Sequence, residues 1–450
     1  MFSFMKHRSA TLVRRNRKIG IGLQLENLEG RTMMSATPIN FTPTVLAPPV
    51  VMNGNLYFAG SDATHGKQLW ESNGTAAGTV MLTNANDSNG GLNPQGLTVV
   101  GNSLYFSGGD SNGVQLWESN GTAQGTAIIT TSNEGVKGFG IFPTDLTNVN
   151  GRLYFTGVDL LKGTQVFTSN GTAAGTVPVT SIGTSGSHPS ELTPVGTSLY
   201  FEATDGVHGY QLWDLNPTTN SSTMMTTGNG TTGMSPSNLT PMGSNLYFSA
   251  NDTVNGFQLW ESNGTAASTV KLSSGGATGV GIGPKSLAAV GSTMYFAAND
   301  GVHGYQLWDS NGTAAGTVMI TDVNPSGGGL RPTDLTAMGS SIFFAANDGV
   351  NGCQLWQSNG TASGTAIVAE INGTVGSNTA NLTVANGLVF FTAYTTQNGY
   401  QVWQSDGTAA GTVMDTSLNT GGSNIPTNFV IMGTSLFFTA PGASLWSMPA

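Results

Sequence analysis

Five aspartates recur at one position of a repeated turn, and among the residues of this sequence their carboxylates are the best suited to bind a metal ion: Asp62, Asp205, Asp252, Asp300 and Asp348. Oxygen-rich Asn-Asp-Gly loops can hold calcium, but the spacing of an EF-hand or of a nonapeptide calcium repeat is absent. An aspartate in a turn more often caps its own backbone. We therefore predict that these five residues are structural, with a calcium site as the alternative and no other cofactor.

Three histidines, His65, His208 and His303, precede a glycine in this turn, where other copies have asparagine. Histidine and asparagine both tolerate a positive φ, which favours a turn role over metal binding or proton transfer. Enzymatic catalysis would need Arg, His, Asp and Glu side chains that converge on one place, and only seven Lys and Arg follow residue 36. We therefore predict no catalytic residue and no enzymatic activity.

These residues belong to a repeated unit. The phrase Gln68-Leu-Trp-Glu-Ser-Asn-Gly-Thr-Ala-Ala-Gly-Thr-Val80 returns along the chain, and its aromatic anchor falls at Trp70, Trp117, Phe167, Trp213, Trp260, Trp308, Trp356, Trp403 and Trp446. Successive anchors are 43 to 50 residues apart, which is in the range of WD40 and kelch propeller blades and too long for one coil of a β-helix. This spacing predicts nine copies of one unit. The regular tryptophans are expected to be core residues between units, with an aromatic sugar platform as the alternative.

Each unit contains four short runs of β-type residues separated by Gly, Asn, Asp and Pro. In the sixth unit these are residues 286–290, 293–297, 305–309 and 317–321, which predicts an antiparallel meander. Because a lone meander exposes both faces, the units must stack, and radial stacking protects most strand edges. The predicted fold class is all-β, a β-propeller of about eight to nine four-stranded antiparallel blades. The ninth unit stops before its fourth strand, and residues 37–42 are expected to pair there.

Charge is unevenly distributed along the chain. Seven of the 14 Lys and Arg precede residue 37, and the remainder has seven basic and 22 acidic residues. An acidic surface repels phosphate backbones and anionic lipids, so nucleic acid is not an expected partner. No apolar run reaches the length of a membrane span. We predict two parts: a basic, disordered export segment, residues 1–36, and a propeller, residues 37–450.

Two segments resemble known families. Leu25-Glu-Asn-Leu-Glu-Gly-Arg-Thr-Met-Met-Ser35 resembles the LEPR-XLL motif of exported bacterial proteins, although Gly30 and the two methionines depart from its usual form. The repeated phrase around Trp70 resembles the ELWxxDGT repeat of exported bacterial proteins. Gln replaces its Glu, Asn replaces its Asp in every copy that keeps the motif except the one at Asp406, and the copy at Asn216 has lost it. These resemblances imply export and a propeller-like fold, but no activity.

The sequence as a whole predicts a noncatalytic, extracellular or cell-surface module that binds a protein or a glycan as a monomer. Two alternatives are a propeller enzyme of the quinoprotein or glycosidase type and a purely structural surface-layer or adhesive element. The Ser-Asn-Gly-Thr turns are nearly identical between copies, whereas the links between units vary, as at residues 84–95, 131–143 and 322–333. Variable loops on a repeated frame commonly carry function. We therefore expect a partner to contact the face that the links form.

Overall fold

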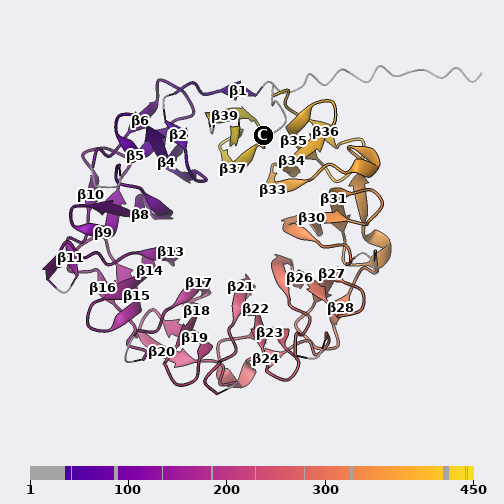
Figure 1. Cartoon of the computed structure of the whole chain (residues 1–450), viewed down its shortest axis with the longest axis horizontal. Helices are drawn as coiled ribbons and strands as arrows, with labels where there is room; N and C mark the ends of the chain where they lie inside the picture. Colours follow the sequence, from indigo (N-terminus) through magenta and orange to yellow (C-terminus); the bar gives the residue numbers. More distant parts are fainter. Residues whose placement is uncertain are drawn as a thin grey trace, which may run out of the picture. The chain divides into compact units, whose positions relative to one another are not determined.

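The computed structural model describes residues 36–450 apart from 42, 86–89, 134, 184–185, 229, 278, 325–327, 419–424, 441 and 443. These residues form a nine-bladed β-propeller of four-stranded antiparallel sheets arranged in a ring (Figure 1). The predicted all-β propeller is confirmed, and the number of blades is nine rather than eight. The predicted export segment and its LEPR-XLL-like motif lie outside the described residues, apart from Ala36.

Each blade runs from an inner strand near the centre of the ring to an outer strand at its rim (Figure 1). The inner strands are β3 (Val50–Met52), β7 (Gln95–Val100), β13 (Thr144–Val149), β17 (Ser190–Val195), β21 (Ser237–Met242), β25 (Lys285–Val290), β29 (Thr333–Met338), β33 (Ala380–Ala385) and β37 (Thr427–Met432). The second strands are β4 (Asn55–Asp62), β8 (Ser103–Asp110), β14 (Arg152–Asp159), β18 (Ser198–Thr204), β22 (Asn245–Asn251), β26 (Thr293–Asn299), β30 (Ser341–Asn347), β34 (Leu388–Thr395) and β38 (Ser435–Ala440). The third strands are β5 (Gly66–Ser72), β9 (Gly113–Ser119), β15 (Gly163–Ser169), β19 (Tyr210–Asn216), β23 (Phe257–Ser262), β27 (Tyr305–Ser310), β31 (Cys353–Ser358), β35 (Gly399–Ser405) and β39 (Ser444–Pro449). The outer strands are β6 (Thr79–Met81), β10 (Thr126–Ile128), β16 (Val177–Pro178), β20 (Ser221–Met224), β24 (Val270–Lys271), β28 (Thr317–Met319), β32 (Ala366–Ala369), β36 (Val413–Met414) and, for blade nine, β1 (Thr37–Pro38).

A few short elements lie outside this pattern. Strand β2 (Thr44–Val45) pairs with β4 in blade one, and β11 (Ser132–Asn133) and β12 (Val136–Lys137) form a hairpin in the link between blades two and three. The described helices are 3-10 turns of three residues: η1 (Ala266–Ser268), η3 (Ala362–Gly364) and η4 (Gly373–Val375). In the described part of the chain, no helix has the length and apolar character that a bilayer crossing requires.

The hydrophobic core lies between neighbouring blades. Leu56, Tyr57 and Phe58 of β4 are at most 2% exposed, because both faces of this sheet are covered by adjacent blades. Trp117 of β9 stacks on Phe106 of β8 with ring centroids 6.2 Å apart, and the same stacking recurs in blades five, six and seven. Four of the repeated tryptophans are buried as predicted: Trp70, Trp117, Trp213 and Trp356. The other four are partly buried and pack against the clusters between blades: Trp260, Trp308, Trp403 and Trp446.

Each inner strand from β7 to β37 contains a β-bulge. Its register against the second strand shifts after the first residue, and the following residue has φ between 53° and 61°. The residues at this position are Gly96, Asp145, Glu191, Asn238, Ser286, Asp334, Asn381 and Asn428. A bulge re-aims side chains locally, so the same unusual backbone conformation recurs around the centre of the ring in eight blades.

Strand β1 closes the ring. It pairs antiparallel with β39, and the backbone N–H of Ile39 donates to the carbonyl of Leu445 at 2.9 Å. Ile39 is buried in a cluster that contains Leu56 of blade one and Phe437 of blade nine. The predicted pairing of the N-terminal strand with the last blade is therefore confirmed.

Candidate functional site

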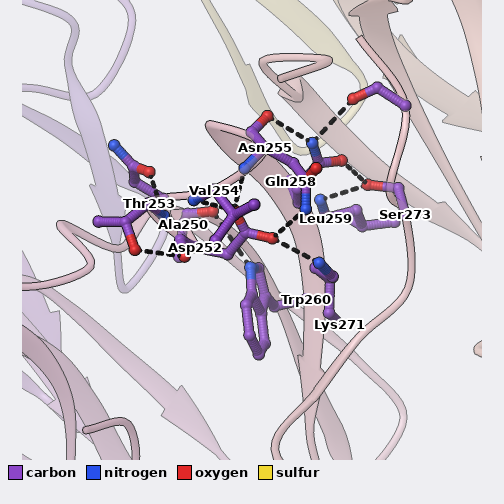
Figure 2. Close-up of polar contacts among 12 residues, drawn as sticks. Ala250, Asp252, Thr253, Val254, Asn255, Gln258, Leu259, Trp260, Lys271 and Ser273 are labelled. Carbon is purple, nitrogen blue, oxygen red and sulfur yellow. Dashed lines mark hydrogen bonds and ion pairs between the residues drawn. The ribbon is translucent and has the colours of Figure 1, made fainter. Parts of the chain in front are cut away.

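The five predicted aspartates each cap the turn between the second and third strands of a separate blade. Figure 2 shows the turn of blade five, where Oδ1 of Asp252 accepts the backbone N–H of Val254 at 3.1 Å and of Asn255 at 2.6 Å. Its Oδ2 accepts a hydrogen bond from the side-chain amide of Asn255 at 3.0 Å and forms an ion pair with Lys271. Oδ1 of the aspartate accepts two backbone N–H groups in the other four turns as well.

The capping hydrogen bonds stabilise the ionised form of these carboxylates. Burial alone would raise the pKa of Asp205, but hydrogen bonds from the backbone and side chain of His208 outweigh it and lower that pKa to about 2. The structure does not bring the five aspartates together. Among the described residues, no three His, Cys, Asp or Glu side chains form a cluster that could hold a metal ion. A calcium ion at the predicted positions would therefore have to bind at single turns, with one carboxylate each.

The histidines of these turns take part in the same capping. Nδ1 of His65, His208 and His303 lies 2.9, 2.6 and 2.6 Å from Oδ2 of the aspartate three residues earlier. The predicted turn role holds, but its predicted reason was wrong. The left-handed backbone conformation belongs to the glycine that follows each histidine, and the histidine contributes its ring instead.

A buried glutamine ties each turn to the link that follows it. Nε2 of Gln258 donates to the carbonyls of Asn255 at 2.9 Å and Gly275 at 2.8 Å, and its Oε1 accepts from Ser273 Oγ at 2.7 Å (Figure 2). Gln258 is fully buried. A neutral amide can donate and accept at once, whereas a carboxylate only accepts and is costly to bury. This accounts for Gln in place of the Glu of the ELWxxDGT repeat.

Three of the eight bulge residues are acidic, and each joins its blade to the next one. Oδ2 of Asp145 accepts the backbone N–H of Leu192 at 3.2 Å, and Oε2 of Glu191 accepts that of Leu239 at 3.0 Å. Oδ2 of Asp334 accepts the backbone N–H of the bulge residue Asn381 of blade eight at 2.9 Å, one position earlier than in the other two cases. The sequence did not single out these carboxylates, because a bulge cannot be recognised from residue types alone.

Glu202 of β18 lies across the sheet from Ser190, next to the bulge residue Glu191. Other blades have a small residue at this position: Ser107, Thr156, Ser249, Ala297, Ala345, Thr392 and Thr439. Burial and, to a smaller extent, the negative charge of Glu191 raise the pKa of Glu202, against a lowering hydrogen bond of 2.9 Å from Ser190 Oγ. Glu202 is therefore a half-buried carboxylic acid that retains its proton to a higher pH than an ordinary glutamate. Glu202 could have been recognised in the sequence, because the equivalent positions of the other repeats hold small residues.

No family model and no curated protein matches this chain. Among solved structures, the chain is similar to a prolyl endopeptidase (TM-score 0.44, 10% identity, covering 79% of this chain and 55% of that one). It is also similar to a puromycin hydrolase (0.41, 11%, 79% and 58%) and to oligopeptidase B from Leishmania major (0.43, 11%, 69% and 46%). The chain thus spans about half of the length of these proteins. The likeness concerns the fold alone.

These comparisons correct two expectations drawn from the sequence. The chain was predicted to be a noncatalytic module and not an enzyme, whereas the solved proteins to which it is similar are peptidases and a hydrolase. The prediction relied on the scarcity of Lys and Arg. That scarcity does not bear on chemistry that uses carboxylic acids.

Proposed function

We propose that the chain is a propeller hydrolase that cleaves glycosidic bonds, with Glu202 as the proton donor. The observation that supports this proposal is the raised pKa of Glu202, caused first by burial and then by the charge of Glu191. Glycoside hydrolysis commonly uses two carboxyl groups, of which one must hold a proton near neutral pH and the other must be ionised. In this proposal Glu191 is the second carboxyl group.

The surroundings of the two glutamates suit these roles. Ser190 Oγ donates to Oε2 of Glu202 at 2.9 Å and fixes that oxygen, while the backbone N–H of Leu239 fixes Oε2 of Glu191 at 3.0 Å. Each carboxyl group therefore keeps one oxygen that these bonds do not use. The proposed substrate is an extracellular glycan, in keeping with the export that the N-terminal motif implies.

The test is hydrolysis by the purified full-length chain of a panel of chromogenic glycosides and soluble polysaccharides. Activity in the wild type is expected to fall as the pH rises through the pKa of Glu202, because the proton donor is then lost. The variant Glu202→Gln is expected to lose activity by at least about 100-fold. Glu202→Thr, which installs the residue of Thr156 in blade three, is expected to lose as much.

The control is Glu370→Gln, which removes an exposed carboxyl group from the link after blade seven. It is expected to leave activity unchanged. Absence of hydrolysis across the panel, or full activity in Glu202→Gln, would overturn the proposal. Melting temperatures of the variants, measured beside activity, separate a loss of chemistry from a loss of folding.

A further inference from the structure

A pocket of about 530 Å³ opens at the junction of blades six and seven. Blade six contributes Lys285, Asn299, Gly304 and Tyr305, and blade seven with its preceding link contributes Gly328, Arg331, Pro332 and Thr333. The lining thus combines two cations, one aromatic ring and neutral polar groups. Its described lining residues include no Val, Leu or Ile side chain.

Both cations belong to exposed residues, and each contacts another residue of the pocket. Nζ of Lys285 lies 3.7 Å from the centroid of the Tyr305 ring, a distance at which the ring face attracts the ammonium group. Nε of Arg331 lies 3.5 Å from the carbonyl oxygen of Gly328. A Cβ atom on Gly328 would come within 2.4 Å of Nη2 of Arg331, so the guanidinium group lies close against the backbone of Gly328.

The backbone around the pocket is equally fixed. The N–H of Tyr305 donates to the carbonyl of Gly328 at 3.1 Å, and the N–H of Arg331 donates to the carbonyl of Tyr305 at 2.9 Å. Arg331 has φ of 53°, and its counterparts Asn93 and Ser235 in other links have φ of 51° and 44°, so the repeated frame sets this backbone conformation. The pocket is therefore organised before any ligand arrives.

The repeats show that the pair of cations Lys285 and Arg331 has no counterpart at the other junctions, although Lys67 of blade one lies at the position of Tyr305. The positions equivalent to Lys285 are Gln95, Thr144, Ser190, Ser237, Thr333, Ala380 and Thr427. The junction of blades four and five lacks both cations. It has Ser190 in place of Lys285 and Ser235 in place of Arg331, and it keeps the aromatic residue as Tyr210. Two of the seven Lys and Arg beyond residue 36 meet in this one pocket of an otherwise acidic chain.

We propose that this pocket binds the carboxylate of an acidic sugar. The guanidinium fork of Arg331 matches a carboxylate, and Lys285 adds a second positive charge. The neutral polar groups of Asn299 and Thr333 offer hydrogen bonds to sugar hydroxyls, and the ring of Pro332 offers an apolar surface. A peptide with apolar side chains would instead require apolar subsites, which the described lining residues do not provide. The inference names a site separate from Glu202 and does not depend on hydrolysis.

The experiment is calorimetric titration of the full-length chain with oligogalacturonate and, separately, with the same oligomer after methyl esterification. Lys285→Ser and Arg331→Ser install the residues found at the junction of blades four and five. Each is expected to weaken binding of the acid form about tenfold, and the double variant about 100-fold. The wild type is expected to bind the ester no more tightly than the double variant binds the acid form. Lys67→Thr, which removes a cation from blade one and installs the residue of Thr164 in blade three, should bind like the wild type.

Equal affinity for the acid and ester forms, or an undiminished affinity in the double variant, would overturn the proposal. Tighter binding of inorganic phosphate or of a peptide with a free C-terminal carboxylate would also overturn the assignment to an acidic sugar. Titrations repeated with Glu202→Gln exclude turnover from the measurement. Absence of hydrolysis by the wild type, with binding retained, would count against the proposed chemistry alone. Hydrolysis by the wild type without binding at the pocket would count against the pocket alone.

Discussion

At the scale of single residues, Asp415 is the clearest departure from the repeat. It follows the outer strand β36 at a position where the other blades have an apolar residue: Leu82, Ile129, Val179, Met225, Leu272, Ile320 and Val368. Its backbone N–H donates to the carbonyl of Val402 at 2.9 Å, as in the other blades. The side chain is 3% exposed, and its Oδ2 has no hydrogen-bond partner among the described residues. Burial raises its pKa to about 7.

Replacing Asp415 by valine is expected to stabilise the protein above pH 7. The folded-state pKa lies above the unfolded value, so the folded state binds more protons than the unfolded state between pH 4 and pH 7, and the wild type loses stability as the pH rises through this range. Asp415→Val removes the buried charge and is expected to raise the free energy of unfolding at pH 8 by roughly 2 kcal/mol or more.

Urea unfolding at pH 5 and pH 8 measures this effect. The gain from Asp415→Val should be larger at pH 8 than at pH 5. An equal gain at both pH values would show that the carboxyl group does not titrate in this range. A variant less stable than the wild type at pH 8 would show that the carboxyl group has a partner that stabilises its ionised form.

At the scale of structural elements, the Ser-Asn-Gly-Thr turn contacts the preceding blade. In blade two, a Cβ atom on Gly121 would lie 2.5 Å from the hydroxyl oxygen of Tyr57 in blade one. That hydroxyl donates to Glu71 Oε1 at 3.0 Å, and burial together with the charge of Glu71 raises the pKa of Tyr57 to about 12. The near-identity of these turns therefore reflects a contact between blades as well as the fold of the turn itself.

Gly121→Ala is expected to destabilise the propeller by at least about 1 kcal/mol more than Gly101→Ala. Both glycines have a positive φ, 94° and 61°, so both variants incur backbone strain. Only Gly121 has a neighbour, because a Cβ atom on Gly101 would meet nothing within 4 Å. Urea unfolding of the two variants isolates the contact, and equal losses would refute its importance.

The elements were largely predictable from the sequence, but the candidate sites were not. The four strands of each unit follow from local alternation and turn residues, and the predicted 293–297 run is found within β26 (Thr293–Asn299). The bulge at Glu191 depends on pairing between strands, which residue types do not encode. The Lys285 pocket combines residues up to 48 positions apart in the sequence, and only the register of two blades brings them together. Glu202 could have been found, since nine aligned copies show it against small residues.

At the scale of the whole molecule, β1 joins the last blade to the first. A Cβ atom on Gly74 of blade one would lie 2.9 Å from Phe437 of blade nine, so the turn contact described above also occurs across this seam. Closure therefore uses the same contacts as any other junction, with one strand supplied from the opposite end of the chain.

Removing residues 1–41 is expected to lower the melting temperature on the order of 5 °C relative to a chain that begins at Ala36. The loss of β1 leaves the edge of β39 unpaired and removes the buried side chain of Ile39. Hydrogen exchange should accelerate in β37, β38 and β39 and much less in blades four to seven. Unchanged exchange in β39 would contradict the role of β1 in closure.

The pairing of β1 with β39 also decides how the propeller bears tension. A force that pulls Ala36 away from the ring acts first on the two residue pairs between these strands and on the packing of Ile39. In the other eight blades the outer strand belongs to the same stretch of chain as the rest of its blade. The force therefore reaches the other junctions only after the pairing of β1 with β39 has broken. A chain anchored through its N-terminal side would therefore open at blade nine under strain and keep blades four to seven, with Glu202 and the Lys285 pocket, intact.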